Sequence, residues 1–340
     1  MRKTDLCGMT PDEIHDFIKT GEYAPAHAIA VASGIYRRHI KTLIENPLIP
    51  KKLQSLLENN FNCELLPPET WQISVDKSVK YLFRTALGKV FETVFIPDGK
   101  RYTVCVSTQS GCRMGCPFCV TSQYGFHGNL TAGEIVNQII SLPDSKKITH
   151  VVFMGMGEPM DNLTEVMRAC EIITSQWGLA ISPANITVST VGITPAVVTF
   201  LEESNCNLTL SLYSPFEDER KKVIPAEKKY PAHEILRIMR NYPIKKKRRL
   251  SVAYVMMHNV NDSENHLYEL KRLLTGSKIR VNLLPYHTGV PNAITSSTVE
   301  RLQYFKHNLV TSGVSASIRK SRGADVSAAC GLLATGKKVN

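Results

Sequence analysis

Three closely spaced cysteines constrain this chain more than any other feature. Cys112, Cys116 and Cys119 follow a C-x3-C-x2-C spacing. Thiolates this close together converge on one soft metal centre, and cysteine thiolates are the ligands of iron–sulfur clusters. Three ligands leave one iron of a four-iron cluster open, and an open metal position is where a substrate or cofactor binds. There are two alternatives. One is a structural zinc site with His127 as the fourth ligand, and the other is a set of three free thiols. The cluster is favoured, because this spacing is far more specific than a single C-x2-C pair.

Composition and charge narrow the classes of protein that fit. The chain has 340 residues, enough for one large domain or a large and a small one. Its formal net charge of +11 favours polyanionic partners, above all nucleic acid. No stretch approaches about 18 apolar residues, and the N-terminus lacks the apolar segment of a signal peptide. Nine cysteines, three of them in a metal-type motif, fit a reducing cytoplasm better than a disulfide framework.

Residues 1–70 predict a small helical module. A capping box at Thr10 and Glu13 begins the first helix, and two further helices are predicted over 26–44 and 51–60. This module is the first candidate for RNA contact. A group of charged and aromatic side chains in this module fits either RNA contact or a solvated helix face equally well. These residues are Tyr36, Arg37, Arg38, His39 and Lys41.

Residues 71–97 predict a linker and a β-hairpin. Two strands at 79–84 and 90–96 are joined by a turn at 87–89. Glu92 lies on the second strand, where its sequence context alone indicates only a solvent-facing carboxylate.

Residues 98–320 alternate apolar, β-branched runs with helical segments. Six strand–helix units in succession predict an α/β fold with a parallel sheet covered by helices, two units short of a full (β/α)8 barrel. A last strand and an irregular tail, 321–340, close the chain. The predicted strands are 102–108, 148–154, 185–189, 207–212, 249–257, 280–284 and 315–319. The predicted helices begin at 131, 161, 194, 232, 264 and 298.

Parallel α/β sheets place ligands at the carboxyl ends of their strands. Five unusual segments follow five of the predicted strands, so we expect one composite site on one face of the sheet. These segments are 111–119, 155–159, 189–192, 211–214 and 284–287.

The open iron of a three-cysteine cluster can bind the amino and carboxylate groups of S-adenosylmethionine. One electron then breaks the sulfonium and releases a radical, chemistry that belongs to the cofactor. Gly155 and Gly157 let the backbone approach such a ligand, and Glu158, Ser189 and Ser211 can hydrogen-bond its amine and ribose. Alone, Gly-x-Gly-Glu-Pro indicates only a strand-to-helix turn. Beside the cysteine motif it predicts an S-adenosylmethionine site.

Two further cysteines belong to the same argument. Cys105 lies on the strand that precedes Cys112. Cys330 lies in a tail of small residues, where it can reach into a pocket as a thiolate nucleophile. The alternatives are a buried strand residue for Cys105 and an exposed bystander for Cys330.

Together these residues resemble the RlmN/Cfr family of radical S-adenosylmethionine RNA methyltransferases. The resemblance runs from about Glu92 to Gly331 and extends more loosely over the N-terminal module. It implies a partial (β/α)6 radical SAM barrel with a small helical N-terminal domain. It also implies a 4Fe–4S cluster on Cys112, Cys116 and Cys119, and two S-adenosylmethionine molecules per turnover. The supporting segments are 92–97, 105–107, 111–119, 153–159, 189–192, 260–262, 281–283 and 328–331.

The resemblance implies methylation of adenosine at an aromatic carbon. Cys330 would first accept a methyl group and become S-methylcysteine. A radical from a second S-adenosylmethionine would take hydrogen from that methyl group, and the carbon radical would add to adenine. Cys105 would then resolve the protein–RNA crosslink by forming a transient disulfide with Cys330. Glu92 is carried over as the proton acceptor.

The carbon that is methylated is assigned on finer differences. Ala253 and 214–216 resemble carbon-8 enzymes, whereas 157–162 and 319–323 look like carbon-2 enzymes. We predict carbon-2, with carbon-8 as the alternative. The family usually carries histidine at Tyr213 and asparagine at His287. The residues matched to S-adenosylmethionine binding are Gly157, Glu158, Ser189, Ser211, Leu212, Tyr213 and His287.

The implied partners are 23S rRNA, tRNA at the adenosine beside the anticodon, and an electron donor such as flavodoxin or ferredoxin. A monomer in the cytoplasm is expected. The basic run 245–249 is a second candidate for RNA contact, or a solvated loop. Two other readings remain: a radical enzyme acting on a small molecule or peptide, which the presence of Cys105 and Cys330 disfavours, and an RNA-binding protein with a structural cluster.

Overall fold

A single large sheet forms the centre of the protein. The computed structural model describes residues 3–40, 43–62, 64–244, 247–287 and 294–333. Within them, ten strands follow the order β14-β13-β12-β11-β10-β9-β6-β5-β4-β3. The middle strands run parallel and neighbour one another in chain order, which is the topology of a partial (β/α)6 barrel and confirms the predicted fold class. They are β6 (Arg101–Cys105), β9 (His150–Phe153), β10 (Ile186–Thr190), β11 (Asn207–Ser211), β12 (Leu250–Met256) and β13 (Arg280–Pro285), with β14 (Ala316–Ile318) added beside β13.

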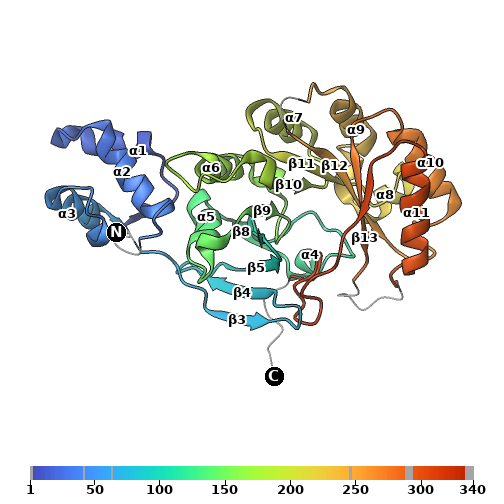
Figure 1. Cartoon of the computed structure of the whole chain (residues 1–340), viewed down its shortest axis with the longest axis horizontal. Helices are drawn as coiled ribbons and strands as arrows, with labels where there is room; N and C mark the ends of the chain where they lie inside the picture. The colour runs from blue at the N-terminus through green and yellow to red at the C-terminus, as the bar shows by residue number, and fades with distance from the viewer. Residues whose placement is uncertain (1–2, 41–42, 63, 245–246, 288–293, 334–340) are drawn as a thin grey trace.

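Helices follow the barrel strands and cover the outer side of the sheet (Figure 1). The predicted capping box at Thr131 and Glu134 is present at the start of the first of them. The predicted starts of two helices, at residues 232 and 264, agree with the structure. The six helices are α5 (Ala132–Ile140), α6 (Leu163–Thr174), α7 (Thr194–Glu203), α9 (Ala232–Asn241), α10 (Glu264–Leu274) and α11 (Val299–Thr311).

The two faces of each barrel strand have different roles. Successive strand side chains point to opposite faces, so every second residue packs into the hydrophobic core. Val188 and Leu210 are fully buried there. The residues that alternate with these along each strand, such as Thr187 and Thr209, line a cavity inside the barrel. The strand pattern therefore yields an apolar outer layer and a polar interior.

A three-stranded antiparallel extension continues the barrel sheet beyond β6. It consists of β3 (Thr70–Ile73), β4 (Val79–Arg84) and β5 (Val90–Asp98), and it includes the predicted hairpin. The register of β5 and β6 pairs Val94 with Cys105. Because directly opposed residues share a face, residues 92, 94 and 105 point to the same side of the sheet.

Three helices near the N-terminus lie beside α5 and α6, at the end of the molecule away from β12 and β13 (Figure 1). They are α1 (Pro11–Ile18), α2 (Pro25–Tyr36) and α3 (Lys51–Asn60). Glu13 forms an ion pair with Arg168 of α6. The first and third predicted helices are confirmed, including the capping box of the first.

The prediction that the second helix reaches residue 44 is wrong. It ends at Tyr36, because His39 adopts the left-handed conformation at φ 54° and the backbone N–H of Ile40 donates to Gly34 O at 3.2 Å. Tyr36 is buried, and its hydroxyl donates to Met9 O at 2.8 Å. It is therefore a core residue and not an RNA contact. Lys41, from the same predicted group, lies outside the described residues.

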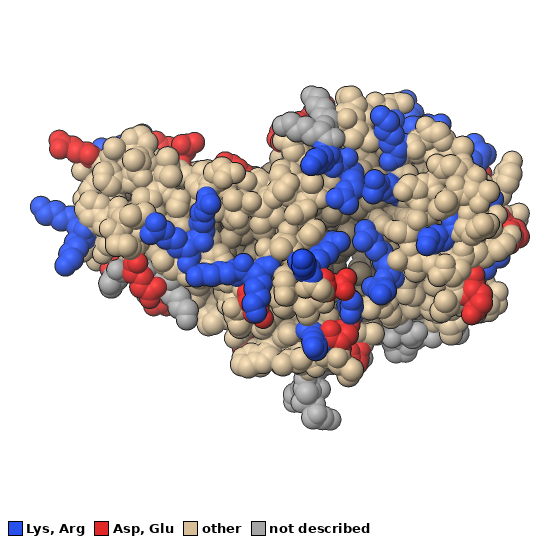
Figure 2. All heavy atoms as spheres, in the orientation of Figure 1, with Lys and Arg blue, Asp and Glu red and all other residues tan. Residues whose placement is uncertain are grey.

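Several short elements that the sequence did not indicate complete the described chain. They are β1 (Thr4–Asp5), β2 (Phe61–Asn62), β7 (Gln109–Gly111), β8 (Phe126–Asn129), α4 (Val120–Tyr124) and α8 (Glu217–Val223), together with short 3-10 turns. Every helix in the described ranges is too short or too polar to cross a lipid bilayer. Lys and Arg side chains gather around a hollow on the face shown in Figure 2, and further basic side chains extend from it toward the N-terminal helices.

Candidate active site

The cysteine motif lies in a loop between β7 and α4. Gly111 begins the loop with φ +77°, and a Cβ at this position would lie 1.7 Å from Gly125 O, so only glycine fits. The backbone N–H of Cys112 donates to the same Gly125 oxygen at 2.9 Å, and that of Cys119 donates to Cys116 O at 3.1 Å. Cys112 and Cys116 are buried and Cys119 is half-buried.

The three thiols lie near enough to affect one another's ionisation. Burial and, to a smaller extent, the neighbouring Cys119 raise the pKa of Cys112 to about 12. Burial and the same neighbour also raise the pKa of Cys116. Among the described residues, no three His, Cys, Asp or Glu side chains converge on a single ion. In a four-iron cluster each cysteine binds a different iron, so its three ligands need not converge on one ion.

An apolar shell encloses the cysteine loop. Phe118 stacks on Tyr213, with ring centroids 5.3 Å apart and an interplanar angle of 12°. Ile224, Met257 and Tyr286 complete a hydrophobic cluster that also contains Cys116. Such a shell limits water access and lowers the local dielectric, which tunes the properties of a bound cluster.

The Gly157–Glu158 turn follows β9 and is tied to the cysteine loop. A Cβ at Gly157, whose φ is +98°, would lie 2.6 Å from the Cβ of Gln109. This close approach lets the backbone N–H of Glu158 donate to Gln109 Oε1 at 2.9 Å. Asp161 then accepts from Gln109 Nε2 at 2.7 Å and from Arg113 Nε at 2.6 Å. The turn and the cysteine loop therefore form one connected unit.

The carboxylate of Glu158 is buried and oriented by three hydrogen bonds. It accepts from the hydroxyl of Thr190 at 2.5 Å and from the backbone N–H groups of Val191 at 2.9 Å and Met160 at 3.0 Å. Burial raises the pKa of Glu158 to about 7, although these hydrogen bonds oppose the shift. A carboxylate offers about four acceptor positions, so this group can accept one further donor such as an ammonium.

The neighbouring strand ends add two hydroxyl groups. Ser189 on β10 and Ser211 on β11 lie side by side, with their Oγ atoms 3.3 Å apart. Tyr213 follows with φ 61°, and its carbonyl accepts from the side-chain amide of Asn261 at 2.8 Å. Leu212, between Ser211 and Tyr213, is buried. The residues predicted at these two strand ends therefore lie together.

A buried arginine, which sequence reasoning missed, organises these strand ends. Arg220 of α8 donates to the carbonyls of Leu212 at 2.9 Å, Ser211 at 3.0 Å and Val191 at 2.5 Å. It also forms an ion pair with Glu227, and both side chains are 1% exposed. Burial lowers the pKa of Arg220 to about 10, while the nearby Cys116 and Glu158 oppose that shift. In the sequence, Arg220 is part of a charged run typical of a solvated helix.

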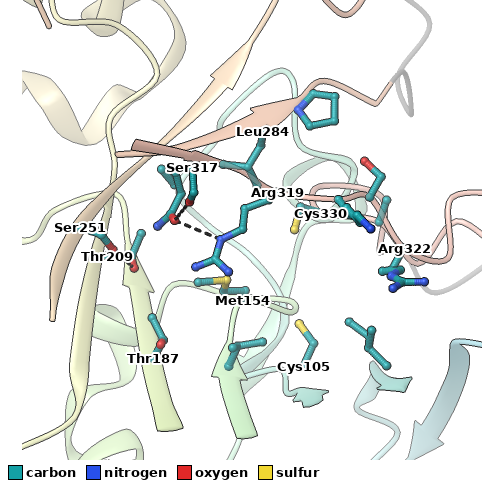
Figure 3. Close-up of a pocket in the computed structure, with 18 of the residues that line it drawn as sticks. Cys105, Met154, Thr187, Thr209, Ser251, Leu284, Ser317, Arg319, Arg322 and Cys330 are labelled. Atoms are coloured by element: carbon teal, nitrogen blue, oxygen red, sulfur yellow. Dashed lines mark hydrogen bonds between the residues drawn. The ribbon is translucent and has the colours of Figure 1, made fainter. Parts of the chain in front are cut away.

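A cavity of about 430 Å³ occupies the barrel interior and contains both further cysteines. Figure 3 shows the sulfur atoms of Cys105, from β6, and Cys330, from the C-terminal tail, both pointing into this cavity. Burial raises the pKa of Cys105, and the proximity of Cys330 raises it further. His287 lines the same cavity, and its Nε2 lies 2.5 Å from the hydroxyl of Ser321.

The first part of the tail is anchored to the β3–β4 turn. Asp325 accepts from the hydroxyl of Ser74 at 2.5 Å and from the backbone N–H of Val75 at 3.0 Å. Asp76 accepts from the backbone N–H of Gly323 at 2.9 Å. These contacts hold the segment that leads to Cys330.

The end of the described tail is anchored to α4, next to the cysteine loop. The backbone N–H of Val120 donates to Gly331 O at 3.0 Å, and the hydroxyl of Thr121 donates to Leu333 O at 2.7 Å. Cys330 is exposed; desolvation and the charge of Cys119, which immediately precedes this helix, raise the pKa of its thiol. The tail therefore places Cys330 at the cavity and near the cysteine loop.

The expectation that Glu92 faces solvent is wrong. Glu92 is 4% exposed, and its Oε1 lies 3.3 Å from Lys80 Nζ on β4. The reason is that β5 is an inner strand of the extended sheet and not the edge of a free hairpin. Through the β5–β6 register, Glu92 shares a face of the sheet with Cys105.

The basic run 245–249 is only partly a surface feature. Residues 245–246 lie outside the described ranges. Arg248 is buried and donates to the carbonyls of Leu201 at 2.7 Å and Ser204 at 2.8 Å, so it is a structural residue. Arg249 lines the barrel cavity.

Comparison with known proteins agrees with this geometry. Residues 106–270 match the model of the Radical SAM superfamily. The chain is similar to a "Probable dual-specificity RNA methyltransferase RlmN" of Parabacteroides distasonis, with 42% identity over 99% of this chain and 98% of the relative. It is also similar to the "Dual-specificity RNA methyltransferase RlmN" of Syntrophotalea carbinolica, with 35% identity over 97% of this chain and 90% of the relative.

A solved structure supports the same assignment. The crystal structure of a radical SAM methyltransferase from Sphaerobacter thermophilus superposes with a TM-score of 0.90 at 34% identity, covering 97% of this chain and 99% of that one. The cofactors of the present protein are therefore a 4Fe–4S cluster and S-adenosylmethionine, which its three thiols and the Glu158 turn fit. The chain belongs to the RlmN family of radical S-adenosylmethionine RNA methyltransferases.

Proposed function

We propose that this protein methylates carbon-2 of an adenosine in 23S rRNA and of the adenosine 3' of the tRNA anticodon. The observation that carries the proposal is the pair of cysteines, Cys105 and Cys330, whose sulfur atoms point into one cavity large enough for a nucleoside (Figure 3). The relatives named as dual-specificity RNA methyltransferases support two kinds of RNA substrate.

The cofactor site would lie at the carboxyl ends of the barrel strands. Cys112, Cys116 and Cys119 would hold the cluster within the apolar shell described above. Glu158 would accept from the ammonium of S-adenosylmethionine. The other contacts are assigned to Gly157, Ser189, Ser211, Leu212, Tyr213 and His287. When bound, the cluster and S-adenosylmethionine supply the radical chemistry, and S-adenosylmethionine also supplies the methyl group.

Cys330 would carry the methyl group as S-methylcysteine. Cys330 is exposed; desolvation by the surrounding protein raises the pKa of its thiol, while the positive charge of Arg319 lowers it. The thiolate is the nucleophilic form, so Arg319 favours attack on the methyl group of a first S-adenosylmethionine. The anchored tail keeps the sulfur at the cavity while the second S-adenosylmethionine is used.

Cys105 and Glu92 would complete the reaction. Once the carbon from Cys330 is bonded to adenine, the thiolate of Cys105 attacks the sulfur of Cys330. A disulfide forms as the bond between that sulfur and the transferred carbon breaks; the electron pair of this bond stays with the carbon, which takes up a proton to become the methyl group. The unpaired electron left by the radical addition would return to the cluster before this step. Glu92 accepts the proton that leaves carbon-2. The burial of Glu92 on the same sheet face as Cys105 supports this role.

The alternative is methylation at carbon-8. Ala253 lines the cavity and contributes no carboxylate there, which is the feature shared with carbon-8 enzymes. The segments 157–162 and 319–323 support carbon-2. We further propose that the protein acts as a monomer in the cytoplasm and receives electrons from flavodoxin or ferredoxin, because the cluster must be reduced from outside.

The test is mass spectrometry of nucleosides from rRNA and tRNA after reaction with reconstituted protein. We expect 2-methyladenosine from the wild type and from Cys7→Ala, a control outside the cavity, and none from Cys330→Ala. 8-Methyladenosine would replace the carbon-2 assignment with the alternative. Full methylation by Cys330→Ala would overturn the methyl-carrier role, and binding of RNA without any S-adenosylmethionine cleavage under reduction would overturn the enzymatic function.

A further inference from the structure

Three arginines from distant parts of the chain line the barrel cavity. Arg101 begins β6, Arg249 precedes β12, and Arg319 follows β14. Arg101 and Arg249 mark the amino ends of their strands, the opposite end from the cysteine loop and the Glu158 turn. We call these three residues the basal arginine cluster.

The positive charges of this cluster are close enough to affect one another. Burial lowers the pKa of Arg101, and Arg319 and Arg249 lower it further. Burial and Arg249 act on Arg319 in the same direction. Such mutual repulsion is a free-energy cost that a bound anion relieves.

Among the described residues no carboxylate forms an ion pair with the basal arginine cluster, and only Asp98 acts on Arg101 from a longer distance. The described residues that line the cavity include no Asp or Glu. Within the described ranges, none of the three arginines forms an ion pair, whereas Arg322 at the same cavity is paired with Asp98 at 2.8 Å. An uncompensated positive site inside a cavity selects a negatively charged group.

Among the described residues, Arg101 and Arg319 keep their terminal nitrogens available, whereas Arg249 donates through Nη2 to Ala184 O at 3.4 Å. Arg101 donates through Nε to Thr103 Oγ1 at 3.2 Å, and Arg319 donates through Nε to Asn282 Oδ1 at 3.1 Å. These bonds orient the side chains while directing the terminal nitrogens elsewhere. A guanidinium held in this way presents the fork that matches the oxygens of a phosphate.

The position of Arg319 connects the cluster to the reacting cysteines. Figure 3 shows its side chain reaching into the cavity between the Thr209 and Ser251 side and Cys330. The charge of Arg319 also acts on the Cys330 thiol. The cavity therefore has one region with the two cysteines and another with arginines that suit a phosphate. Its volume of about 430 Å³ suits a nucleotide.

We propose that the basal arginine cluster binds a backbone phosphate next to the target adenosine, so that the base points toward Cys105 and Cys330. The RNA then enters the barrel from the amino ends of its strands. The basic side chains around the hollow in Figure 2 would continue this contact along the RNA backbone. This inference rests on the proposed function, because it names the substrate contact of the same cavity.

The first experiment measures binding of an anticodon stem-loop RNA by fluorescence anisotropy, without turnover. Arg101→Gln and Arg319→Gln are each expected to weaken binding about tenfold. Each should also reduce the slope of log Kd against log salt by about 0.7 to 1. The matched control is Arg237→Gln, an exposed arginine on the outer helix α9, which should bind as wild type does. Equal losses in all three variants, or none, would overturn the proposal.

The second experiment identifies the phosphate. The same stem-loop is made with a neutral methylphosphonate on either side of the target adenosine. At one of these positions the methylphosphonate should weaken binding by the wild type and by Arg237→Gln about tenfold. Arg319→Gln should bind the methylphosphonate RNA and the unmodified RNA with nearly the same affinity, because it has already lost the contact to that phosphate. A methylphosphonate penalty that is the same in Arg319→Gln and wild type at both positions would show that Arg319 does not contact that phosphate.

Turnover separates this inference from the proposed function. The arginine variants should raise KM for the stem-loop, while Arg237→Gln should keep the wild-type KM. A wild-type protein that binds the stem-loop but yields no methyladenosine would refute the proposed function and leave the binding result intact. Unchanged KM in both variants would refute the phosphate contact alone.

Discussion

The sulfur atoms of Cys105 and Cys330 point into the same cavity, although Cys105 lies on the first barrel strand and Cys330 on the C-terminal tail. Cys105 is buried and Cys330 is exposed. Burial raises the pKa of the Cys105 thiol, which keeps it protonated at neutral pH and limits unproductive reactions before substrate binds. Because both sulfur atoms point into one cavity, Cys105 and Cys330 can form a disulfide with each other without a third cysteine.

Replacement of the resolving cysteine should trap an intermediate. In Cys105→Ala, Cys330 still delivers its carbon to adenine, but no thiolate is present to attack the Cys330 sulfur. We expect a covalent protein–RNA species that migrates slowly on a denaturing gel and a loss of methylated product of at least about a hundredfold. Cys170→Ala, a buried cysteine outside the cavity, is the control. Release of normal product by Cys105→Ala would assign resolution to another group.

Loosening the tail should affect the methyl carrier and not the cofactor site. Asp325→Ala removes the two hydrogen bonds to Ser74 and Val75. We expect methyl loading of Cys330, followed by peptide mass spectrometry, to slow about tenfold because the sulfur is less well positioned. S-adenosylmethionine affinity should stay unchanged. The control is Glu202→Ala, an exposed carboxylate at the end of α7. Equal loading in all three proteins would contradict the anchoring role.

Arg220 should be among the most sensitive positions for stability. Arg220→Met leaves the buried carboxylate of Glu227 without its ion-pair partner and frees the carbonyls of Leu212, Ser211 and Val191. Breaking one side of a buried ion pair costs about 3–5 kcal/mol, which urea denaturation of the metal-free protein would measure. The double variant Arg220→Met/Glu227→Gln should lose less than the single variant. A larger loss in the double variant would show that the ion pair is not the source of the cost.

The buried carboxyl of Glu158 should make stability depend on pH. Its pKa is raised from the model-peptide value of 4.5 to about 7 by burial, so the folded protein keeps a proton that the unfolded chain has lost. Stability therefore falls as pH rises from about 4.5 to about 7. Relative to Glu158→Gln, the wild type should lose about 3 kcal/mol of unfolding free energy over this range, measured by urea titration without cofactors. A difference that does not change with pH would mean that the carboxyl is ionised when folded.

Cofactor binding gives a second readout at the same carboxyl. An ammonium beside Glu158 favours the carboxylate, so S-adenosylmethionine should release a proton on binding near pH 6.5. Calorimetry in two buffers of different ionisation enthalpy would detect the proton. Glu158→Gln should bind more weakly and release none.

Much of the architecture could be read from local patterns. The alternation of β-branched runs and helical segments predicted the six strand–helix units, because side-chain periodicity is a property of neighbouring residues. The capping boxes at Thr10 and Thr131 marked helix starts for the same reason. The cysteine spacing predicted the cluster, since the three ligands come from one loop. The second helix was predicted too long, because His39 gives no local sign of its left-handed conformation.

The sequence by itself determined the cysteine motif and the order of the strands and helices, and it predicted Cys105 and Cys330 as the reacting cysteines. Only the tertiary structure decided which charged residues are buried. Arg220, Arg248 and Glu92 all lie in stretches that look solvated, yet each is buried by segments distant in the chain. The basal arginine cluster likewise exists only because the strands that begin at Arg101 and after Arg249 lie in one curved sheet with Arg319. Burial and electrostatic coupling depend on three-dimensional neighbours, so no local pattern could reveal them.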